Sequence, residues 1–437
     1  MVGLILGGWS DGRAGHPSRL AIRATTPPKY RDALRNVSNW IVDNHPDSQA
    51  AVHDDDISLG IRMTGSHHRE TRISDSGVPV RRLRVGVVGL SHYHVTGWVE
   101  TLETLDDLVE IVALYDPDPE RGRTLGPPHH DPTLRAALGE RYRDLPFETR
   151  LDDLIARHAL DLALVTLPNV DAPGAIAQLA SSGIHLLIDK PAARSAGELR
   201  PAREAVRASG VRAVVGLTRR YAPAMLAAHD LIAAGGLGRF IAAEAVFATS
   251  SVAVRDPANL LFDPERSGGG ILSWLGVHDV DALLWLSAEA ITVVSAMAGS
   301  VGHPGLDVED VMSVAVRFAG GAIGTIQHAY TLPAPGYRGH LALRGLDASV
   351  ELGLDDDLVV LTRDADGRLH ESRRTFVSPP AVGYGPEGRA AVIDLLGAIR
   401  DGRETQAPLD ALVRALDVID AAYESARTGR HVRLGER

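Results

Sequence analysis

From Leu83 onward, short apolar runs alternate with helix-length segments, and this alternation constrains the fold more than any other feature of the chain. The run LRVGVVGL at residues 83–90 is continuous and rich in valine, which is typical of a strand buried on both faces. Later apolar runs end at Asp116, Asn169 and Asp189, with helical segments between them. Strands and helices of these lengths in alternation predict a doubly wound parallel sheet, an α/β Rossmann domain.

The last helix of this domain has clear end signals. Ser195 is followed by Glu198 three residues later, a capping box that predicts a helix over residues 196–209, and Gly210 is a typical helix terminator. We therefore expect residues 81–210 to form the first folded domain.

Residues 211–437 have a different pattern, in which strands follow one another in hairpin order. The DADG at residues 364–367 is a strong hairpin signal, and two amphipathic helices close the chain. Consecutive strands with helices to one side predict an α+β domain on a large, mainly antiparallel open sheet.

Residues 1–80 are rich in Pro, Ser, Asp, His and Arg and show no sustained helical or strand periodicity. We expect a mostly disordered extension with a short helix near residues 30–44, or a mis-assigned start with translation beginning near Met63. Its histidines could suggest a metal site, but a solvated tail is the favoured interpretation; they are His53, His67 and His68.

Composition excludes several classes of function. The net charge is −11 with both signs scattered, which argues against nucleic-acid binding, and no apolar run reaches the roughly 18 residues of a membrane-spanning helix. Cysteine is absent, which removes disulfides, thiolate nucleophiles and zinc–thiolate sites. We expect a cytoplasmic protein without a metal site or a membrane partner.

The turn after the first strand departs from the usual dinucleotide-binding pattern. A G-x-G-x-x-G turn lets backbone N–H groups approach a pyrophosphate, whereas this chain has Gly89-x-Ser91-x-x-His94. Asp116 ends the second strand, where a carboxylate would bind ribose hydroxyls and repel a 2′-phosphate, so NAD is favoured over NADP. A Rossmann-like domain without a nucleotide is the alternative. The candidate cofactor-binding residues here are Gly89, Leu90, Ser91, His92, His94 and Asp116.

Lys190 is unusual because the chain has only one other lysine, Lys29, and uses arginine almost everywhere else. The segment IHLLIDKP carries Lys190 to the carboxyl edge of the predicted sheet, where ligands of open α/β sheets bind. An ammonium is compact and its pKa shifts readily, so Lys190 can hydrogen-bond or move a proton where a guanidinium cannot. A surface lysine without a role is the alternative.

A Gly-rich loop at residues 268–270 leads into a predicted helix that contains His278. Helical spacing would align Trp274, His278, Asp281 and Trp285 on one face. His278 is a candidate proton-transfer group, and a buried core histidine is the alternative.

Together these segments resemble the Gfo/Idh/MocA family, named after glucose–fructose oxidoreductase, inositol dehydrogenase and a rhizopine-catabolism protein. The resemblance covers about residues 83–434 and rests on five motifs in the family's order: RVGVVGL, LVTLPN, IDKPAA with Asp189 in place of the family's Glu, SGGGILSWLGVHDVD and ALDVIDAAYESARTGRHVRL.

The resemblance implies an NAD(P)-dependent oxidoreductase that moves hydride between nicotinamide and a sugar, inositol or sugar-derived polyol. It implies that Lys190 hydrogen-bonds the reacting oxygen, that His278 is the general base, and that the protein forms a homodimer or homotetramer. The remaining implied site residues are Thr166, Pro168, Asn169, Asp189 and Lys190 for the cofactor, and Arg219, Tyr221, Trp274 and Asp281 for the substrate.

One departure from the family bears on chemistry. Trp274 stands where dehydrogenases of this family usually carry the Asp of a Lys/Asp/His set, and an indole cannot accept a proton. Asp281 or Asp279 could compensate, and Trp274 could instead stack on a sugar. A catalytically weak nucleotide- and sugar-binding sensor is therefore the second functional hypothesis.

Overall fold

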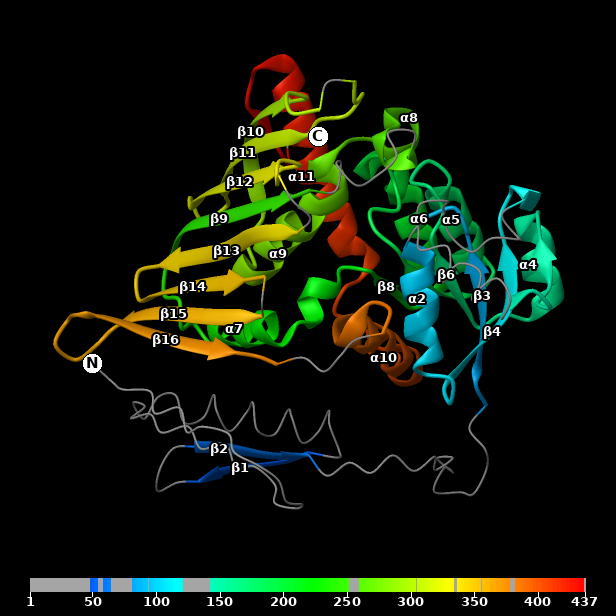
Figure 1. The fold of residues 1–437 in the computed structure, drawn as a ribbon, viewed down its shortest axis with the longest axis horizontal. Helices are drawn as coiled ribbons and strands as arrows, with labels where there is room; N and C mark the ends of the chain where they lie inside the picture. The colour runs from blue at the N-terminus through cyan, green and yellow to red at the C-terminus, as the bar shows by residue number, and fades with distance from the viewer. Residues whose placement is uncertain are drawn as a thin grey trace. The chain divides into compact units, whose positions relative to one another are not determined.

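The computed structural model describes the chain as two compact units, Met1–Arg72 and Ile73–Arg437, each of which is considered by itself. The described residues are drawn in colour in Figure 1 and comprise 48–53, 58–63, 81–92, 94–120, 142–250, 259–303, 305–333, 336–354, 356–377 and 382–435.

The first unit contains one described hairpin. Strand β1 (Ser48–His53) pairs antiparallel with β2 (Ser58–Met63), with Ser48 opposite Met63. The helix expected at residues 30–44 and the histidines at 67 and 68 lie outside the described residues. The disorder expected for residues 1–80 thus stays a prediction.

The second unit begins with a parallel sheet, as the strand–helix alternation predicts. Its described strands follow the order β5-β4-β3-β6-β7-β8, and every neighbouring pair is parallel. The strands are β3 (Leu83–Val88), β4 (Val109–Tyr115), β5 (Phe147–Glu148), β6 (Leu162–Val165), β7 (His185–Ile188) and β8 (Ala213–Val215). The Rossmann prediction is confirmed.

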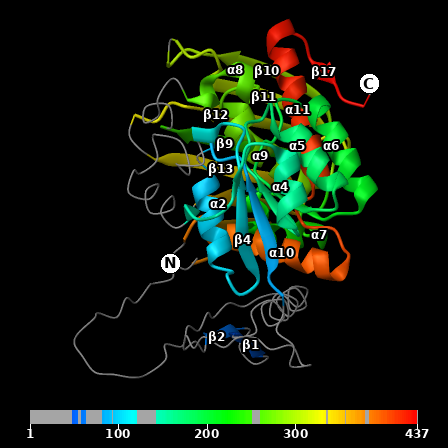
Figure 2. The ribbon, with the colours of Figure 1, turned by 90° about the vertical axis from the view of Figure 1, so that its right-hand side faces the viewer.

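Helices cover both faces of this sheet, with α2 on one side and α4 on the other (Figures 1 and 2). Ser195 Oγ accepts a hydrogen bond from Glu198 N at 3.3 Å, and Gly210 has a φ of 71°, so both predicted helix ends are present. The helices are α2 (His94–Glu103), α4 (Leu151–His158), α5 (Ala172–Ser181) and α6 (Ala196–Ser209).

One predicted boundary differs from the structure. Strand β8, assigned to the second domain, pairs with β7, so the first domain extends past residue 210 to at least Val215. Helix α2 begins at His94, and His92 Nδ1 accepts the first helical N–H, that of His94, at 3.1 Å.

A large sheet follows, and its described strands run in the order β16-β15-β14-β13-β9-β12-β11-β10-β17 (Figure 1). The described pairs are antiparallel except β9 with β12, which is parallel. The strands are β9 (Phe240–Thr249), β10 (Ile291–Gly299), β11 (Val311–Phe318), β12 (Ile323–Ala329), β13 (Tyr337–Gly345), β14 (Ala348–Gly353), β15 (Asp357–Arg363), β16 (Leu369–Thr375) and β17 (Val432–Arg433). The predicted α+β domain is confirmed.

The core of this domain lies between one sheet face and the helices that pack on it. Strand β11 alternates strictly, with Met312, Val314 and Val316 buried and Ser313 and Ala315 exposed on the other face. The helical segments are η3 (Thr218–Tyr221), α7 (Pro223–Ala233), η5 (Leu260–Phe262), α8 (Pro264–Ser267), the π-helical turn η6 (Leu272–Gly276), α9 (Val277–Ser287), α10 (Gly385–Asp401) and α11 (Leu409–Thr428).

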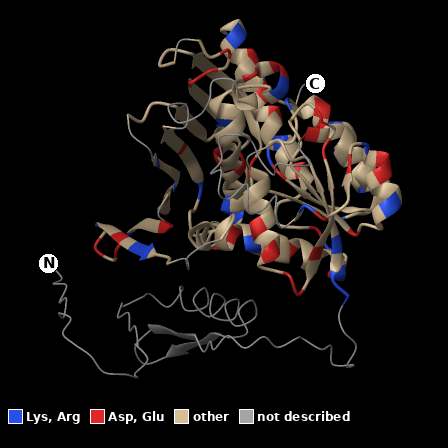
Figure 3. Ribbon diagram, turned by 45° about the vertical axis from the view of Figure 1, so that its right-hand side comes forward, with Lys and Arg blue, Asp and Glu red and all other residues tan. Residues whose placement is uncertain are grey.

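Among the described residues, no helix combines the length and the apolar character needed to cross a membrane. In the view of Figure 3, positions of basic and acidic residues are interspersed along the described ribbon.

Candidate active site

The turn between β3 and α2 requires a glycine at its start. Gly89 has a φ of +100°, and a Cβ there would lie 2.6 Å from Leu167 N and 2.8 Å from Leu167 Cα. Thr166 Oγ1 donates a 2.5 Å hydrogen bond to Gly89 O. The backbone of Leu167 lies so close to position 89 that this position of the predicted cofactor turn requires a glycine.

Asp116 ties this turn to the end of β4. Its Oδ2 accepts the N–H of Leu90 at 2.7 Å, and its Oδ1 accepts the N–H of Asp118 at 3.0 Å. The side chain is buried, so its carboxylate is held in one orientation at the strand end where a ribose-binding carboxylate was predicted.

A small cleft of about 140 Å³ opens beside the turn. Among its described lining residues, Ser91, Asp116 and Pro168 were predicted from the sequence. The others were not predicted, namely Pro117, Asp118, Leu167, Asp171 and Arg266. Arg266 lies on α8 just before the Gly-rich loop. The strand pattern of the first domain does not predict that this residue lines the cleft.

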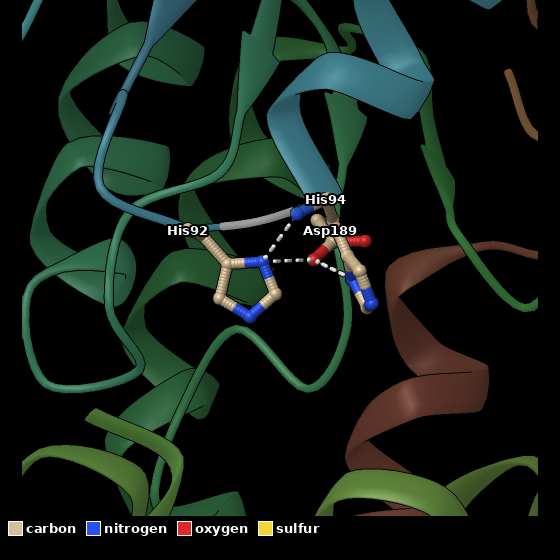
Figure 4. Close-up of side chains that lie close together, drawn as sticks. All are labelled: His92, His94 and Asp189. Carbon is tan, nitrogen blue, oxygen red and sulfur yellow. Dashed lines mark hydrogen bonds and ion pairs between the residues drawn. The ribbon is translucent and has the colours of Figure 1, made fainter. Parts of the chain in front are cut away.

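His92, His94 and Asp189 form a cluster at this edge of the sheet (Figure 4). Asp189 Oδ2 lies 2.8 Å from His94 Nδ1 and 3.5 Å from His92 Nδ1, and Asp189 Oδ1 accepts Trp98 Nε1 at 3.0 Å. Burial raises the pKa of Asp189, against the opposing effects of His92 and Lys190.

Lys190 joins the two domains. Its Nζ donates to the main-chain carbonyl of Trp274 at 2.6 Å and lies 5.6 Å from the centre of the Trp274 ring. The lysine is only 5% exposed. Lys190, which follows β7, therefore contacts the main chain of η6, the turn that leads into the helix of His278.

The Gly-rich helix begins with the π-turn η6, which Glu309 anchors. Glu309 accepts Gly270 N at 2.7 Å, Leu272 N at 3.0 Å and the Tyr423 hydroxyl at 2.8 Å. Burial raises the pKa of Glu309, partly offset by these hydrogen bonds. This support was not predicted, since Glu309 lies in a loop without a motif.

His278 lies on α9. Its Nδ1 is buried and has no hydrogen-bond partner among the described residues. Burial, followed by the positive charges of Lys190 and Arg219, lowers the pKa of His278 well below its usual value. The imidazole is therefore neutral at pH 7.

Asp279, the residue after His278, is held by groups from two other elements. Arg219 of η3 forms an ion pair with Asp279 Oδ1, and His328 Nε2 of β12 lies 2.9 Å from Asp279 Oδ2. Burial acts to raise the pKa of Asp279, but Arg219 and His328 outweigh it and the pKa is lowered. His328 was missed, although the alternation of β12 puts it on the buried face.

Asp281 and Tyr221, which were predicted as substrate contacts, are held by other side chains of the protein. Both oxygens of Asp281 are bound by Arg220, at 2.6 and 2.8 Å, and the Tyr221 hydroxyl donates to Asp394 at 2.8 Å. Both side chains are buried. The π-turn lies between Leu272 and Gly276, so it changes the spacing of Trp274 relative to His278 but not that of His278 and Asp281, which both lie on the α-helix α9.

Trp274 and Asn169, which were predicted to contact the substrate and the cofactor, also make contacts within the protein. Trp274 is buried, and one face of its indole stacks on His92 with ring centres 5.2 Å apart, so that face cannot stack on a sugar. Asn169 is buried and its Nδ2 donates to Ser267 O at 2.7 Å, which ties β6 to α8 rather than lining the described cleft.

Two family profiles match the chain and together cover most of its second unit. Residues 83–217 match the oxidoreductase family with an NAD-binding Rossmann fold, and residues 225–351 match the GFO/IDH/MocA C-terminal domain.

Curated relatives are sugar and polyol dehydrogenases by name. The chain is 25% identical over 278 residues to the NAD⁺-dependent scyllo-inositol 2-dehydrogenase of Bacillus subtilis, covering 63% of this chain and 74% of the relative. It is 24% identical over 308 residues to the levoglucosan dehydrogenase of Pseudarthrobacter phenanthrenivorans, covering 62% and 78%.

Solved structures share the fold. Levoglucosan dehydrogenase in complex with NADH and L-sorbose superposes with a TM-score of 0.69 at 20% identity, covering 82% of this chain and all of the other. GenD2 from gentamicin A biosynthesis, in complex with NAD, gives a TM-score of 0.65 at 25% identity, covering 85% of this chain and all of the other.

Proposed function

We propose the chemistry of this protein from one premise, that the chain belongs to the Gfo/Idh/MocA family of NAD-binding oxidoreductases. The protein transfers hydride between a nicotinamide cofactor and a CH–OH carbon of a sugar, an inositol or a sugar-derived polyol. The names of its relatives, an inositol dehydrogenase and a levoglucosan dehydrogenase among them, support this substrate class.

The residues at the β3–α2 turn fit a dinucleotide. Gly89 lies so close to Leu167 that any side chain would fill the backbone cradle, and Asp116 is fixed at the adjoining strand end. Bound there, the nicotinamide supplies or accepts the hydride. The cleft beside the turn has three carboxylates, Asp116, Asp118 and Asp171, against one guanidinium, which favours NAD over the 2′-phosphate of NADP.

Proton transfer is assigned to His278, and polarisation of the reacting oxygen to Lys190. The observation that carries this assignment is the buried Nδ1 of a neutral His278, which has no hydrogen-bond partner among the described residues and whose pKa is lowered by burial and then by the nearby Lys190 ammonium. In the oxidation direction, His278 takes the hydroxyl proton while Lys190 donates a hydrogen bond to the same oxygen. A neutral base beside a fixed cation is the arrangement that this step needs.

Arg219 remains a candidate substrate contact. Its side chain is 28% exposed while its guanidinium pairs with Asp279, next to His278. Trp274 stands in the place of the family's Asp. In this chain we therefore assign the negative charge that accompanies the base, His278, to the carboxylate of Asp279.

The second hypothesis, a catalytically weak sensor of the same fold, is not favoured, because the named relatives are dehydrogenases and Lys190 and His278 are both retained. A cytoplasmic location and a homodimeric or homotetrameric state belong to the proposal. The exposed face of the large sheet supports oligomerisation, since alternate residues of β11 face outward without a covering helix, and light scattering after size exclusion tests it.

NADH binding followed by turnover tests the function. Fluorescence titration should detect binding, and a polyol and sugar panel with NAD⁺ should raise the nicotinamide absorbance. Lys190→Ala and His278→Ala should each lower kcat by roughly 10²–10⁴-fold, while the surface control His340→Ala should match wild type.

Binding without turnover across a broad panel would favour the sensor. Variants within a few-fold of wild type would refute the catalytic assignment.

A further inference from the structure

We propose that His92, His94 and Asp189 form a binding site for one first-row divalent transition-metal ion, such as Zn²⁺. Each of these residues contributes one ligand atom, and the three atoms all lie within 4.8 Å of one another. No metal site was predicted from the sequence, because His92 and His94 are far from Asp189 along the chain and only the fold brings them together.

The spacing of the atoms suits a shared cation. Figure 4 shows both imidazole Nδ1 atoms facing the same carboxylate oxygen, Asp189 Oδ2, at 2.8 Å for His94 and 3.5 Å for His92. Tetrahedral zinc with ligand bonds of about 2.0–2.1 Å separates its ligand atoms by about 3.3 Å. Small side-chain rotations therefore convert the existing cluster into a coordination shell.

The donor set selects the type of ion. Two imidazole nitrogens with one carboxylate oxygen suit Zn²⁺, Co²⁺, Ni²⁺ and Cu²⁺, whereas Mg²⁺ and Ca²⁺ prefer a shell of oxygens. Three protein ligands also leave a fourth position for water or an external ligand, as in exchangeable rather than closed structural sites.

Neighbouring groups already orient the carboxylate. Trp98 Nε1 donates to Asp189 Oδ1 at 3.0 Å, which leaves Oδ2 directed to the imidazoles. Gly216 leaves the room for this support, because a Cβ there would lie 2.9 Å from the Trp98 ring and 3.4 Å from Asp189 Oδ1. Such outer contacts fix ligand geometry in metal proteins.

Metal binding would change contacts that the cluster already makes. The Lys190 ammonium donates to the carbonyl of Trp274 at 2.6 Å. Metal binding would replace the 3.1 Å bond from His94 N to His92 Nδ1 and the 2.8 Å contact of His94 with Asp189. Both are single hydrogen bonds, and each is weaker than a metal–imidazole bond.

This inference goes beyond the proposed redox function and is tested without it. The full chain, stripped with EDTA and free of NADH and substrate, is titrated with Co²⁺ while visible ligand-field absorbance and heat are recorded, and Zn²⁺ is then added as a competitor. The Co²⁺ titration would still measure metal binding at this site even if the chain failed to bind NADH.

Wild type and the control His340→Ala, a surface histidine beside Glu244, should bind one Co²⁺ per chain, and Zn²⁺ should displace it. His94→Ala, His94→Gln and Asp189→Asn should bind about 100-fold or more weakly, since even outer-shell changes cost 10–100-fold. Circular dichroism and the thermal midpoint of each variant show whether it is folded. Zn²⁺ should raise the thermal midpoint of wild type but not that of the three variants.

Absence of ligand-field bands in wild type at excess Co²⁺ would overturn the proposal. Equal affinity in wild type and folded His94→Gln would overturn it as well, because the cluster would then be a hydrogen-bonded network only.

Discussion

Replacing Asp420 with asparagine should change how the stability of this protein depends on pH. Asp420 lies on α11, and its Oδ2 accepts the N–H of Ala196 at 3.0 Å, at the first turn of α6. Burial is the main cause that raises its pKa from 3.8 to about 6, with the charge of Asp417 adding to it. The asparagine side chain would keep an acceptor oxygen for Ala196 N but would never ionise.

The sign follows from the proton count. Between pH 3.8 and about 6 the folded state holds a proton on Asp420 that the unfolded state has lost, so the free energy of unfolding falls as the pH rises through this window. A raised pKa of about two units corresponds to about 3 kcal/mol at 1.36 kcal/mol per unit. Part of this loss already occurs below pH 4, so between pH 4 and pH 7 Asp420→Asn should gain about 2.4 kcal/mol relative to wild type.

Urea unfolding of both proteins at several values between pH 4 and pH 7 measures this difference. Tryptophan fluorescence and far-UV circular dichroism must give coincident transitions before a two-state free energy is used. Asp153→Asn is the control, since it removes a carboxylate of a surface pair with Arg157 at 3.1 Å. A wild-type-minus-variant difference that stays flat with pH would refute the reasoning.

Three further outcomes are expected. Gly89→Ala should lower the free energy of unfolding by about 1–3 kcal/mol and weaken NADH binding in fluorescence titration, because a Cβ at φ +100° would lie 2.6 Å from Leu167 N; unchanged binding would contradict this. Arg220→Ala should cost about 3–5 kcal/mol in urea unfolding, because it leaves the Asp281 carboxylate buried without its partner; a loss under about 1 kcal/mol would count against it. The acidic limb of the kcat/KM profile should lie below about pH 6.5, since the pKa of His278 is depressed and its base form persists into acid; a limb at or above that pH would contradict the assignment.

The fold was largely predictable because its signals are local. The valine-rich run at 83–90, the cap at Ser195 and the left-handed Gly210 each depend on residues near them in sequence, and each appears as expected. Strand alternation in β11 likewise predicts which face is buried. The parallel pairing of β9 with β12 was not predictable, since no local pattern records which distant strand becomes a neighbour.

The candidate site was predictable in part. Lys190 was identified as a rare lysine at the end of a predicted strand, and His278 as a histidine in the helix after the Gly-rich loop. The structure brings the segments that carry them together. The ion pair of Asp281 with Arg220 was not predictable, because the two residues are distant in sequence and no local pattern records their contact. His328 was hidden inside an ordinary strand, where only three-dimensional proximity to Asp279 gives it importance.

Lys190 is tethered by the peptide carbonyl at position 274, not by the side chain there. Every amino acid has that oxygen, so the tether tolerates replacement of the residue that bears it. The residue type at 274 thus decides which side chain lies beside the amine, while the hydrogen bond that links the amine to the second domain is made by the backbone.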